Sequence, residues 1–598
     1  MLLWQGGYME QRLNEIIGDY ENKIEKTNQK SNILGIVKLV LFAALVFTGV
    51  RLCLISNYLG WGIVAAAELV LFVFVLIWHN RVLDGIQQMK GIRSIALRDR
   101  KRLLGEWQEG EDDGEDLAGE EHPYARDLDI IGKRSLFQYI NCTHTFHGRR
   151  KLAEDLLSSE YSIEEIQKRQ QMIHEVSRDY DRASYMEYVF SQIDTGEETA
   201  VLLEQLKDRE PFSGGRWLAA LLKGMRGLTV AACGYLVCFR TNAGFALLGI
   251  LLFIQFCLWR LGEYKTRHYL EQLRRASRKI MPYNLAVREV LSREFNAVRG
   301  KELQEILAEA QKGMDELAHL SRNVGWCHNL LSDFLLNVTF LWSYKNAYDL
   351  QRWKEAYGEK VEAWFGALGE MECFLSFANL LRSCDKMCAP EVAAEIKGFG
   401  GVDLGHPLLS NKDRVCNDFE MEDGIVILSG SNMSGKSTFM RTVGINMVLA
   451  RAGSYVCAEA MRCGCPRIMT SMRIVDRTTE GISTFYSELL RIRQIIDAAG
   501  EREQVYFLID EIFRGTNSVD RRKGAEGVIQ KLCQQGCCGI ITTHDLEICE
   551  RQKEAEGIKN YSFCEEYRDG EMYFTYTLQE GVAKTTNGEF LLKKVGIL

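Results

Sequence analysis

The sequence predicts a mixed α/β domain with a mainly parallel sheet at the C-terminal end, joined to an all-α region that carries two apolar helical hairpins. Three observations support this prediction. Apolar runs of strand length alternate with helical patterns from about residue 400 onwards. Apolar residues spaced by three and four run from about 261 to 395, and the whole chain has only 6 prolines to interrupt helices. Long apolar stretches occur in two pairs before residue 260.

A phosphate-binding loop is the most informative motif of the C-terminal region. The segment GSNMSGKST (430–438) lies between the apolar run Ile425–Leu428 and a helical pattern over 439–450. Strand, glycine-rich loop, Lys-Ser and helix form a P-loop, in which backbone N–H groups and a helix N-terminus cradle phosphate. In that motif, Lys436 supplies charge to the β- and γ-phosphates, and Ser437 supplies a hydroxyl to Mg²⁺.

Two more strand patterns end in side chains suited to nucleotide chemistry. The apolar run Val505–Ile509 ends in Asp510 and Glu511, and the run 539–543 ends in His544. Beside a P-loop, Asp510 is expected to hold the Mg²⁺ shell, and Glu511 to polarise the attacking water as general base. His544 is expected to reach the γ-phosphate.

Several segments together resemble the MutS family of DNA mismatch-repair proteins. Those that resemble its ATPase domain are GSNMSGKSTFMRT (430–442), ISTFYSEL (482–489), FLIDEIFRGTNSVD (507–520), TTHD (542–545) and GVAKTTNGEFLLKKVGIL (581–598). Those that resemble its core domain and helical lever are SLFQYINCTHTFHGRRKLAEDLLS (135–158) and FLSFANLLRSCDKMCAPEV (374–392). The resemblance implies a P-loop ATPase domain of ABC-like fold that binds ATP and Mg²⁺ and works as a homodimer, with DNA as a partner of the helical core.

The resemblance also implies roles for individual residues. The residues implied to cradle phosphate and metal are Gly430, Asn432, Gly435, Lys436, Ser437 and Thr438. Glu511, His544 and Lys436 are the implied catalytic groups, and Ser437 and Asp510 the implied metal ligands. Because this family closes two sites across a dimer, Ser483 and Thr484 are implied to contact the nucleotide of a partner subunit. Arg514 and Asp520 are implied at the same interface.

The sequence departs from the family pattern in two places. The family often has an aromatic residue, which stacks on adenine, just before the Asn-Asp of the segment VCND (415–418), and here that position is Arg414. A guanidinium can also stack on a base, so ATP is still expected, but base selectivity stays open. The N-terminal region contains no Phe-x-Glu wedge, so the mismatch-recognition domain is expected to be absent.

The N-terminal half instead carries apolar stretches of membrane-spanning length. The first hairpin is predicted over Ile33–Ile55 and Tyr58–Trp78. The second is predicted over Gly227–Phe239, which can be extended back to Trp217, and Ala243–Trp259. The alternative for the second pair is two buried helices of a soluble core, because segments of about 10–14 residues are more often core than membrane.

Lys and Arg residues flank both hairpins. The turn of the first hairpin contains neither, and the turn of the second contains only Arg240. The positive-inside rule therefore places both ends of both hairpins in the cytoplasm. The expected location is a multi-pass protein of the cell membrane with a cytoplasmic ATPase domain. The first apolar run begins too far into the chain, and lacks the small-residue cleavage site, for a cleavable signal peptide.

Composition does not favour a dominant nucleic-acid surface. The net charge is -8 and the pI about 5.9, so a basic stripe would have to be local, as in HGRRK (147–151) or RRASRK (274–279). The 18 cysteines are scattered, without the spacing of a zinc site. A cytoplasmic location argues against disulfides.

The predicted organisation has seven segments. They are an N-terminal cytoplasmic segment (1–32), the first hairpin (33–79), a basic helix with an acidic, mobile linker (80–127), the first portion of the helical core (128–216), the second hairpin (217–260), the helical lever with the remaining portion of the core (261–400), and the ATPase domain (401–598).

Two functions are compatible with this organisation. The first is a membrane-anchored, MutS-like ATPase that acts on DNA. The second is a membrane-bound, ABC-like mechanoenzyme that acts on a protein or lipid partner and has no DNA role. The acidic pI and the missing wedge favour the second, and the core-domain resemblance favours the first.

Overall fold

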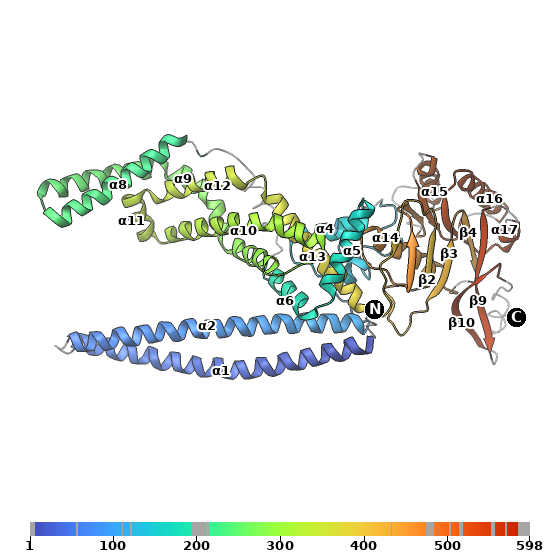
Figure 1. Cartoon of the computed structure of the whole chain (residues 1–598), viewed down its shortest axis with the longest axis horizontal. Helices are drawn as coiled ribbons and strands as arrows, with labels where there is room; N and C mark the ends of the chain where they lie inside the picture. The colour runs from blue at the N-terminus through green and yellow to red at the C-terminus, as the bar shows by residue number, and fades with distance from the viewer. Residues whose placement is uncertain are drawn as a thin grey trace.

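The computed structural model describes residues 6–54, 58–110, 112–119, 122–158, 160–193, 212, 215–431, 433–473, 484–500, 504–513, 518–551, 557–568 and 571–583. Within these residues the chain is mixed α/β with mostly helical content, and the strands are confined to its C-terminal third. Figure 1 shows the strands gathered at one end of an elongated molecule, from which helices extend towards the other end.

Two sheets form the C-terminal domain. The larger has the strand order β10-β9-β4-β8-β7-β6, and all its neighbouring pairs are parallel except β9 with β10. Its strands are β4 (Ile425–Gly430), β6 (Arg467–Ser471), β7 (Val505–Ile509), β8 (Cys538–Thr543), β9 (Ile558–Arg568) and β10 (Glu571–Glu580). The smaller has the order β1-β5-β2-β3 and consists of β1 (Glu391–Val392), β5 (Ala460–Cys463), β2 (Phe399–Leu404) and β3 (Asn417–Met421).

Strands β4, β7 and β8 are buried along their whole length, as expected for parallel strands covered on both faces. The helices of this domain are α14 (Lys436–Arg451), α15 (Thr484–Gly500), α16 (Ser518–Gln534) and α17 (Leu546–Arg551). Because β4, β7 and β8 lie side by side and run parallel, their carboxyl ends meet at one edge of the sheet. That edge holds the polar residues that the sequence singled out.

The helical region packs around one long helix, α13 (Val361–Ser383), most of whose residues are buried. The helices before it are α3 (Leu136–Ile140), α4 (Phe146–Leu157), α5 (Ile163–Ser177), α6 (Tyr180–Ser191), α10 (Val298–Gly325), α11 (Leu330–Phe340) and α12 (Trp342–Tyr357), with short 3-10 turns η1 (Glu115–Leu117) and η2 (Trp326–His328). One hydrophobic core runs from these helices into the C-terminal domain, where it includes Phe439 and Val443 of α14. The helical region and α14 therefore contribute side chains to one hydrophobic core.

Among the residues that the structure describes, four helices are long and apolar enough to cross a membrane, by length and composition. They are α1 (Gly6–Leu54), α2 (Tyr58–Leu103), α8 (Gly215–Phe239) and α9 (Asn242–Leu291). Their candidate spans lie within Met9–Leu52, Gly60–Leu103, Ala220–Phe239 and Asn242–Glu271. α8 thus extends well before Gly227, so the shorter estimate of that span is wrong and the extension towards Trp217 fits the helix.

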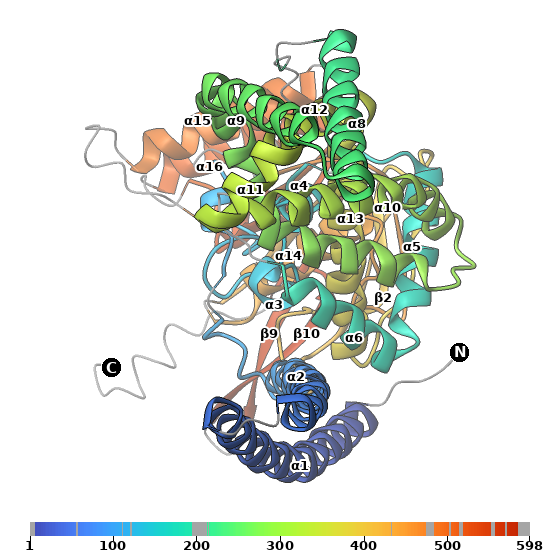
Figure 2. The same cartoon turned by 90° about the vertical axis from the view of Figure 1, so that its left-hand side faces the viewer.

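The two helical pairs point the same way. In Figure 1 the α1–α2 pair runs along one side of the molecule, and both this pair and the α8–α9 pair reach their far ends on the side opposite the sheets. Figure 2 views the molecule from that side and shows the two pairs on opposite sides of the helical body. Many of their large apolar side chains are exposed, among them Val40, Phe47, Val70, Phe74, Val230, Val237, Phe245 and Phe253.

The acidic segment after α2 is ordered against the helical core, so the prediction of a mobile linker is wrong. Trp107 is buried in the core, and Gln138 donates an amide hydrogen bond to the carbonyl of Gly110 at 2.7 Å. Arg149 of α4 pairs with Asp112 at 2.8 Å and with Asp116 at 2.5 Å. The sequence showed the acidic charge but not the arginine, far along the chain, that neutralises it.

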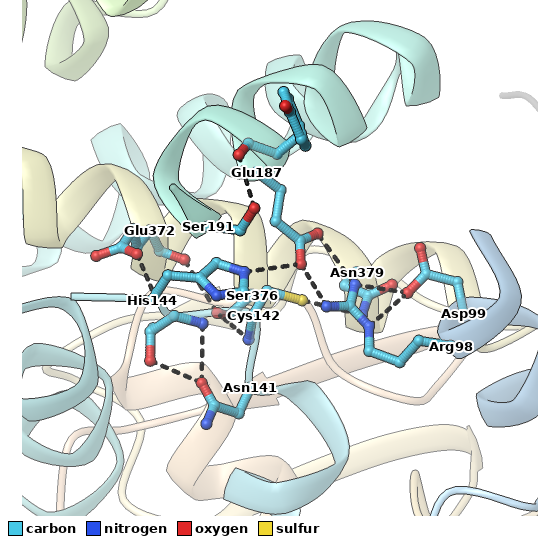
Figure 3. A network of polar contacts seen from close by, with 12 residues as sticks. Arg98, Asp99, Asn141, Cys142, His144, Glu187, Ser191, Glu372, Ser376 and Asn379 are labelled. Atoms are coloured by element: carbon cyan, nitrogen blue, oxygen red, sulfur yellow. Dashed lines mark hydrogen bonds and ion pairs between the residues drawn. The ribbon is translucent and has the colours of Figure 1, made fainter. Parts of the chain in front are cut away.

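A network of polar contacts joins α2 to the core helices (Figure 3). Arg98 of α2 forms an ion pair with Glu187 of α6 and another with Asp99 at 2.8 Å. Glu187 is buried, and His144 lies 3.4 Å from the same carboxylate. Breaking a buried ion pair costs several kcal/mol, because it leaves a charge without its partner. The C-terminal end of α2 is therefore firmly attached to α6.

Glu372 of α13 lies in the same network and caps the start of α4. Its carboxylate accepts from the backbone N–H of His144 at 2.6 Å and of Thr145 at 3.1 Å, and it contacts the Thr145 hydroxyl. Full burial raises the pKa of Glu372 from 4.5 to about 7, although these hydrogen bonds oppose the shift. Because the folded state favours the protonated acid, the contribution of Glu372 to stability falls as pH rises from about 4.5 to about 7.

We expect Glu372→Gln to stabilise the protein relative to wild type at pH 8 but not at pH 5. Glutamine mimics the protonated acid, and the pKa shift corresponds to about 3 kcal/mol. The midpoint of thermal unfolding of the full chain in detergent, measured at both pH values, checks this. Glu154→Gln, at an exposed position on α4, is the control. A difference between variant and wild type that is the same at both pH values would contradict the expectation.

Candidate nucleotide site

The loop between β4 and α14 has the backbone that phosphate binding requires. Gly430 and Gly435 have φ of 146° and 105°, a region that favours glycine. A Cβ on Gly430 would lie 2.7 Å from the carbonyl oxygen of Phe563, so no side chain fits there. α14 begins at Lys436, and its first N–H groups have no helical partners. Loop and helix end therefore offer backbone donors to an anion.

Lys436 lies at the base of this loop and is only 4% exposed. Its Nζ donates to the carbonyls of Gly430 and Ser431, each at 2.8 Å. Burial lowers the pKa of Lys436, and the carboxylates of Glu511, Asp510 and Glu565 act in the opposite direction. One buried ammonium thus faces three carboxylates, so a polyphosphate needs a further cation to bind there.

Ser434 provides a direct test of whether the loop fits phosphate. Its Oγ is buried and has no hydrogen-bond partner among the described residues, although the side chain lines the cavity of the loop. An unpaired buried hydroxyl is unfavourable. A phosphate oxygen in the cavity is an acceptor of the kind that this hydroxyl lacks, so the residues present fit a nucleotide phosphate.

Ser437 and Asp510 lie together, as a metal shell requires. The Ser437 hydroxyl donates to Asp510 Oδ2 at 2.6 Å, across the gap between α14 and the end of β7. Thr542, at the end of β8, donates to the other carboxylate oxygen of Asp510 at 2.6 Å and accepts from the backbone N–H of Glu511 at 2.7 Å. The hydroxyl and carboxylate are oxygen ligands of the kind Mg²⁺ prefers.

Glu511 and His544 form the second polar pair of the site. His544 Nε2 lies 2.5 Å from Glu511 Oε1, and its Nδ1 lies 3.1 Å from the carbonyl oxygen of Gly430. Because a carbonyl only accepts, Nδ1 carries a proton. Glu511 has φ of 51°, and Glu488 of α15 accepts from the N–H of Phe513 at 2.5 Å, which holds this turn.

A cavity of about 510 Å³ extends from the loop to an apolar end. Its lining includes the loop residues Gly435, Lys436, Ser437 and Thr438, the carboxylate Glu511 and the ring of Tyr576, and, away from the loop, Leu404, His406, Leu409, Val415 and Asn417. Burial lowers the pKa of His406 to about 3, so its ring is neutral. The cavity is thus charged at the loop, and its other end is largely apolar or neutral, with Asp413 as the one carboxylate among the described residues that line it.

Tyr576 is a residue that the sequence did not reveal. It lies in a bulge of β10 between Phe574 and Leu578, with φ of 55°. Asn417 holds the bulge, since its amide donates to the Tyr576 carbonyl at 3.0 Å and its oxygen accepts from Leu578 N–H at 2.7 Å. A Cβ on Gly435 would lie 3.1 Å from the Tyr576 ring, so the ring lies directly against the loop.

Arg414 does not face the cavity. Its guanidinium donates to the carbonyls of His406 at 3.0 Å and Leu409 at 2.6 Å, and it contacts Cys384. It is absent from the described residues that line the cavity. The expectation that Arg414 stands at the base-stacking position is therefore wrong, because the arginine braces a surface loop. The aromatic residues that line the cavity are Phe439, Phe563 and Tyr576.

The structure describes only two of the four residues implied at a dimer interface, Thr484 and Asp520. Ser483 and Arg514 lie outside the described residues, as does Asn432 of the chain's own phosphate-binding loop. Thr484 begins α15, and Asp520 lies in the first turn of α16. Neither Thr484 nor Asp520 lines the described cavity of its own chain, so their assignment to a neighbouring site stays a prediction.

The loop, the paired carboxylates and the largely apolar end of the cavity together form a site typical of nucleotide-binding α/β domains. Residues 426–596 match the family model described as MutS domain V. A portion of the chain is also similar to proteins named DNA mismatch repair protein MutS. The protein of Aquifex pyrophilus is 31% identical over 198 residues, which cover 32% of this chain and 23% of the relative. That of Thermotoga petrophila is 32% identical over 228 residues, 37% of this chain and 28% of the relative. The match spans about a quarter of the length of these relatives.

Proposed function

We propose that this chain is an Mg²⁺-dependent ATP hydrolase of the MutS type, anchored in a membrane. The observation that carries the proposal is that Lys436, Ser437 and Glu511 line one cavity, while Asp510 contacts Ser437 and His544 contacts Glu511. These side chains come from the start of α14 and from the ends of the neighbouring strands β7 and β8, and each has a separate role in phosphoryl transfer to water. The match over residues 426–596 supports the same class.

The roles of the residues follow from their positions. Gly430, Asn432, Gly435 and Thr438 belong to the loop whose N–H groups and hydroxyl bind phosphate. Lys436 moves its Nζ from the loop carbonyls to the β- and γ-phosphates. Mg²⁺, when bound by Ser437 and Asp510, supplies charge neutralisation between the phosphates and the carboxylates. Glu511 takes the proton of the attacking water, and His544 orients the Glu511 carboxylate beside the γ-phosphate.

We expect Tyr576→Ala to weaken ATP binding about 5- to 150-fold, because stacking on a base is worth about 1–3 kcal/mol. Binding of inorganic triphosphate, which has no base, should change little. Both affinities can be measured by titration calorimetry with the purified full chain. Tyr573→Ala, on the same strand but outside the cavity lining, is the matched control. Equal losses for ATP and triphosphate would show that Tyr576 supports the loop rather than the base.

The dimer is the second element of the proposal. Two chains that face each other through their nucleotide domains would bring Ser483, Thr484 and Asp520 of one chain to the phosphates of the other. Thr484 begins α15 and Asp520 lies in the first turn of α16, so both are near helix N-termini. Helix N-termini favour negative charge and can contact a γ-phosphate across an interface.

The third element is the membrane. We infer that α1, α2, α8 and α9 cross the bilayer of the cell membrane, with all four cytoplasm-proximal ends on the side of the nucleotide domain. Their composition, the exposure of their apolar side chains and the common direction of both pairs support this (Figure 1). A water-exposed surface of this kind is unusual in soluble proteins.

Two partners compete for the helical region. DNA is one, from the names of the relatives. The second candidate is a protein or lipid partner that a mechanoenzyme would move. The ion pairs formed by the basic segment 147–151 favour this second candidate. Arg149 pairs with Asp112 and Asp116, Arg150 with Glu154, and Lys151 with Asp155. These charges are neutralised within the chain and leave little for phosphates of DNA.

Binding of a labelled DNA duplex to the full chain in detergent, with and without ATP, separates the two partners. If DNA is the partner, affinity falls steeply with salt, because phosphate contacts release counterions. If the chain does not bind the duplex either with or without ATP, DNA is rejected as the partner. The mechanoenzyme with a protein or lipid partner is then the remaining candidate.

A further inference from the structure

Helix α11 has an inverted distribution of polar and apolar side chains. Its large apolar residues face outward, and Leu330 is 88% exposed. The exposed set is Leu330, Leu331, Phe334, Leu335 and Phe340. The one fully buried residue of the helix is the polar Asn337. In water this arrangement is unfavourable by roughly 25 cal/mol for each Å² of exposed apolar surface. Contact between the outward face and another apolar surface would therefore stabilise the protein.

The polar groups of α11 are satisfied inside the protein. Asn337 donates to the Asp333 carboxylate at 2.6 Å and accepts from the N–H of Ser343 at 2.8 Å. The hydroxyl of Ser332 donates to the carbonyl of Trp326 at 2.7 Å, and that of Thr339 to Leu335 at 2.6 Å. These contacts leave the outward face without hydrogen-bonding side chains.

The C-terminal end of α11 is satisfied as well, although helix ends normally leave carbonyls open to water. With its amide nitrogen turned to α11, Gln255 of α9 donates to the carbonyls of Val338 at 2.9 Å and Thr339 at 2.7 Å. Arg226 of α8 donates to the carbonyl of Phe340 at 2.9 Å. Backbone groups that are paired within the protein are the condition for irregular structure at membrane depth.

The outward face of α11 is continuous with the apolar pair α8–α9. Phe334 packs edge-on against Phe256 and Trp259 of α9, with ring centroids 6.3 Å and 6.1 Å apart. In Figure 1 α11 lies at the end of α10 and α12 from which α8 and α9 extend. Figure 2, viewed along that direction, shows α11 in front of α13 and α14.

Two tryptophans flank α11. Trp326, before the helix, stacks on Trp342, after it, with centroids 6.3 Å apart, and Trp326 is 64% exposed. The Trp342 ring N–H donates to the carbonyl of Asn323 at 2.9 Å, and Lys345 lies over the same ring. Tryptophans and cations beside an apolar face are typical of the boundary between lipid headgroups and acyl chains.

We propose that α11 is a third membrane element, which lies in the cytoplasmic leaflet beside α8–α9 and contacts acyl chains through Leu330, Leu331, Phe334, Leu335 and Phe340. The proposal rests on the membrane location proposed above. The helix has 11 residues, about half the length needed to cross the hydrocarbon core, so it stays in one leaflet. Its continuity with α8–α9 selects lipid as the cover over a second copy of the chain.

Photocrosslinking in the full chain tests this contact. p-Benzoylphenylalanine is placed at Leu335, at Val230 as an α8 position for lipid, and at Ala356 as an exposed α12 position for water. Each variant is reconstituted into vesicles of phosphatidylcholine and phosphatidylglycerol, irradiated and analysed by mass spectrometry. We expect lipid adducts at positions 335 and 230 and none at 356.

The other outcomes are informative too. Lipid adducts at 230 with none at 335 would overturn the role of α11 and leave the membrane location intact. A crosslink from 335 to a second copy of the chain would assign this face to a dimer instead. Absence of lipid adducts at 230 would overturn the membrane location itself, and the α11 proposal with it.

Discussion

Glu511→Gln is expected to slow ATP hydrolysis about 10²- to 10⁴-fold, the usual contribution of a general base. Glutamine keeps the shape of the side chain and can still contact His544, but it cannot take the proton of the attacking water. ATP affinity should change little, since Lys436 and the loop remain. Phosphate release at saturating ATP and equilibrium binding of a fluorescent ATP analogue measure the two properties separately.

The matched control is Glu550→Gln, on the exposed face of α17 in the same domain. It removes one carboxylate of the same kind without touching the cavity. Turnover in Glu511→Gln equal to that of the control would remove Glu511 from the catalytic role, whatever its geometry.

Lys436→Ala is expected to have the largest effect on ATP binding. Truncating one member of a buried, hydrogen-bonded charge pair costs about 2–5 kcal/mol, or about 30- to 5,000-fold in affinity. Here the loss is compounded, because Glu511, Asp510 and Glu565 then face the phosphates without the ammonium. Equilibrium binding of ATP in the presence of Mg²⁺ measures it.

Lys531→Ala, at an exposed position of α16, serves as the control for loss of a lysine from this domain. Circular dichroism should show the same helical content for both variants. If Lys436→Ala bound ATP as tightly as the Lys531→Ala control, the loop at residues 430–438 would not be the phosphate site.

The site could be predicted from sequence where its components are contiguous. The P-loop lies between a strand and a helix, and Asp510, Glu511 and His544 each follow a buried strand directly. Parallel neighbours then place all three strand ends at one edge. Tyr576 could not be found this way, because its place in the cavity depends on a bulge that Asn417 holds from another sheet.

The errors share a physical cause. The sequence patterns around Arg414 and in the acidic segment after α2 do not show which groups these charged side chains contact in the fold. Arg414 braces the carbonyls of His406 and Leu409, and Asp112 and Asp116 neutralise Arg149. Charged side chains take their role from whichever opposite charge or carbonyl the fold brings near, and sequence spacing does not record that.

The helices proposed to lie in the membrane also differ in how clearly the sequence indicates them. The long apolar helices were visible because about 20 apolar residues in a row are rare in soluble chains. α11 was not, since 11 residues are too few to distinguish a membrane helix from a core helix. Only the outward direction of its leucines and phenylalanines supports the proposed contact with lipid.

ATP hydrolysis across a flotation gradient tests the central claim, a membrane-anchored ATPase, most directly. The full chain is reconstituted into phospholipid vesicles, washed with high salt and floated, and phosphate release is measured in every fraction with and without Mg²⁺. We expect Mg²⁺-dependent hydrolysis that floats with the vesicles and is absent from a parallel Lys436→Ala preparation. Hydrolysis that remains with soluble protein at the bottom of the gradient, or that persists in Lys436→Ala, would contradict it.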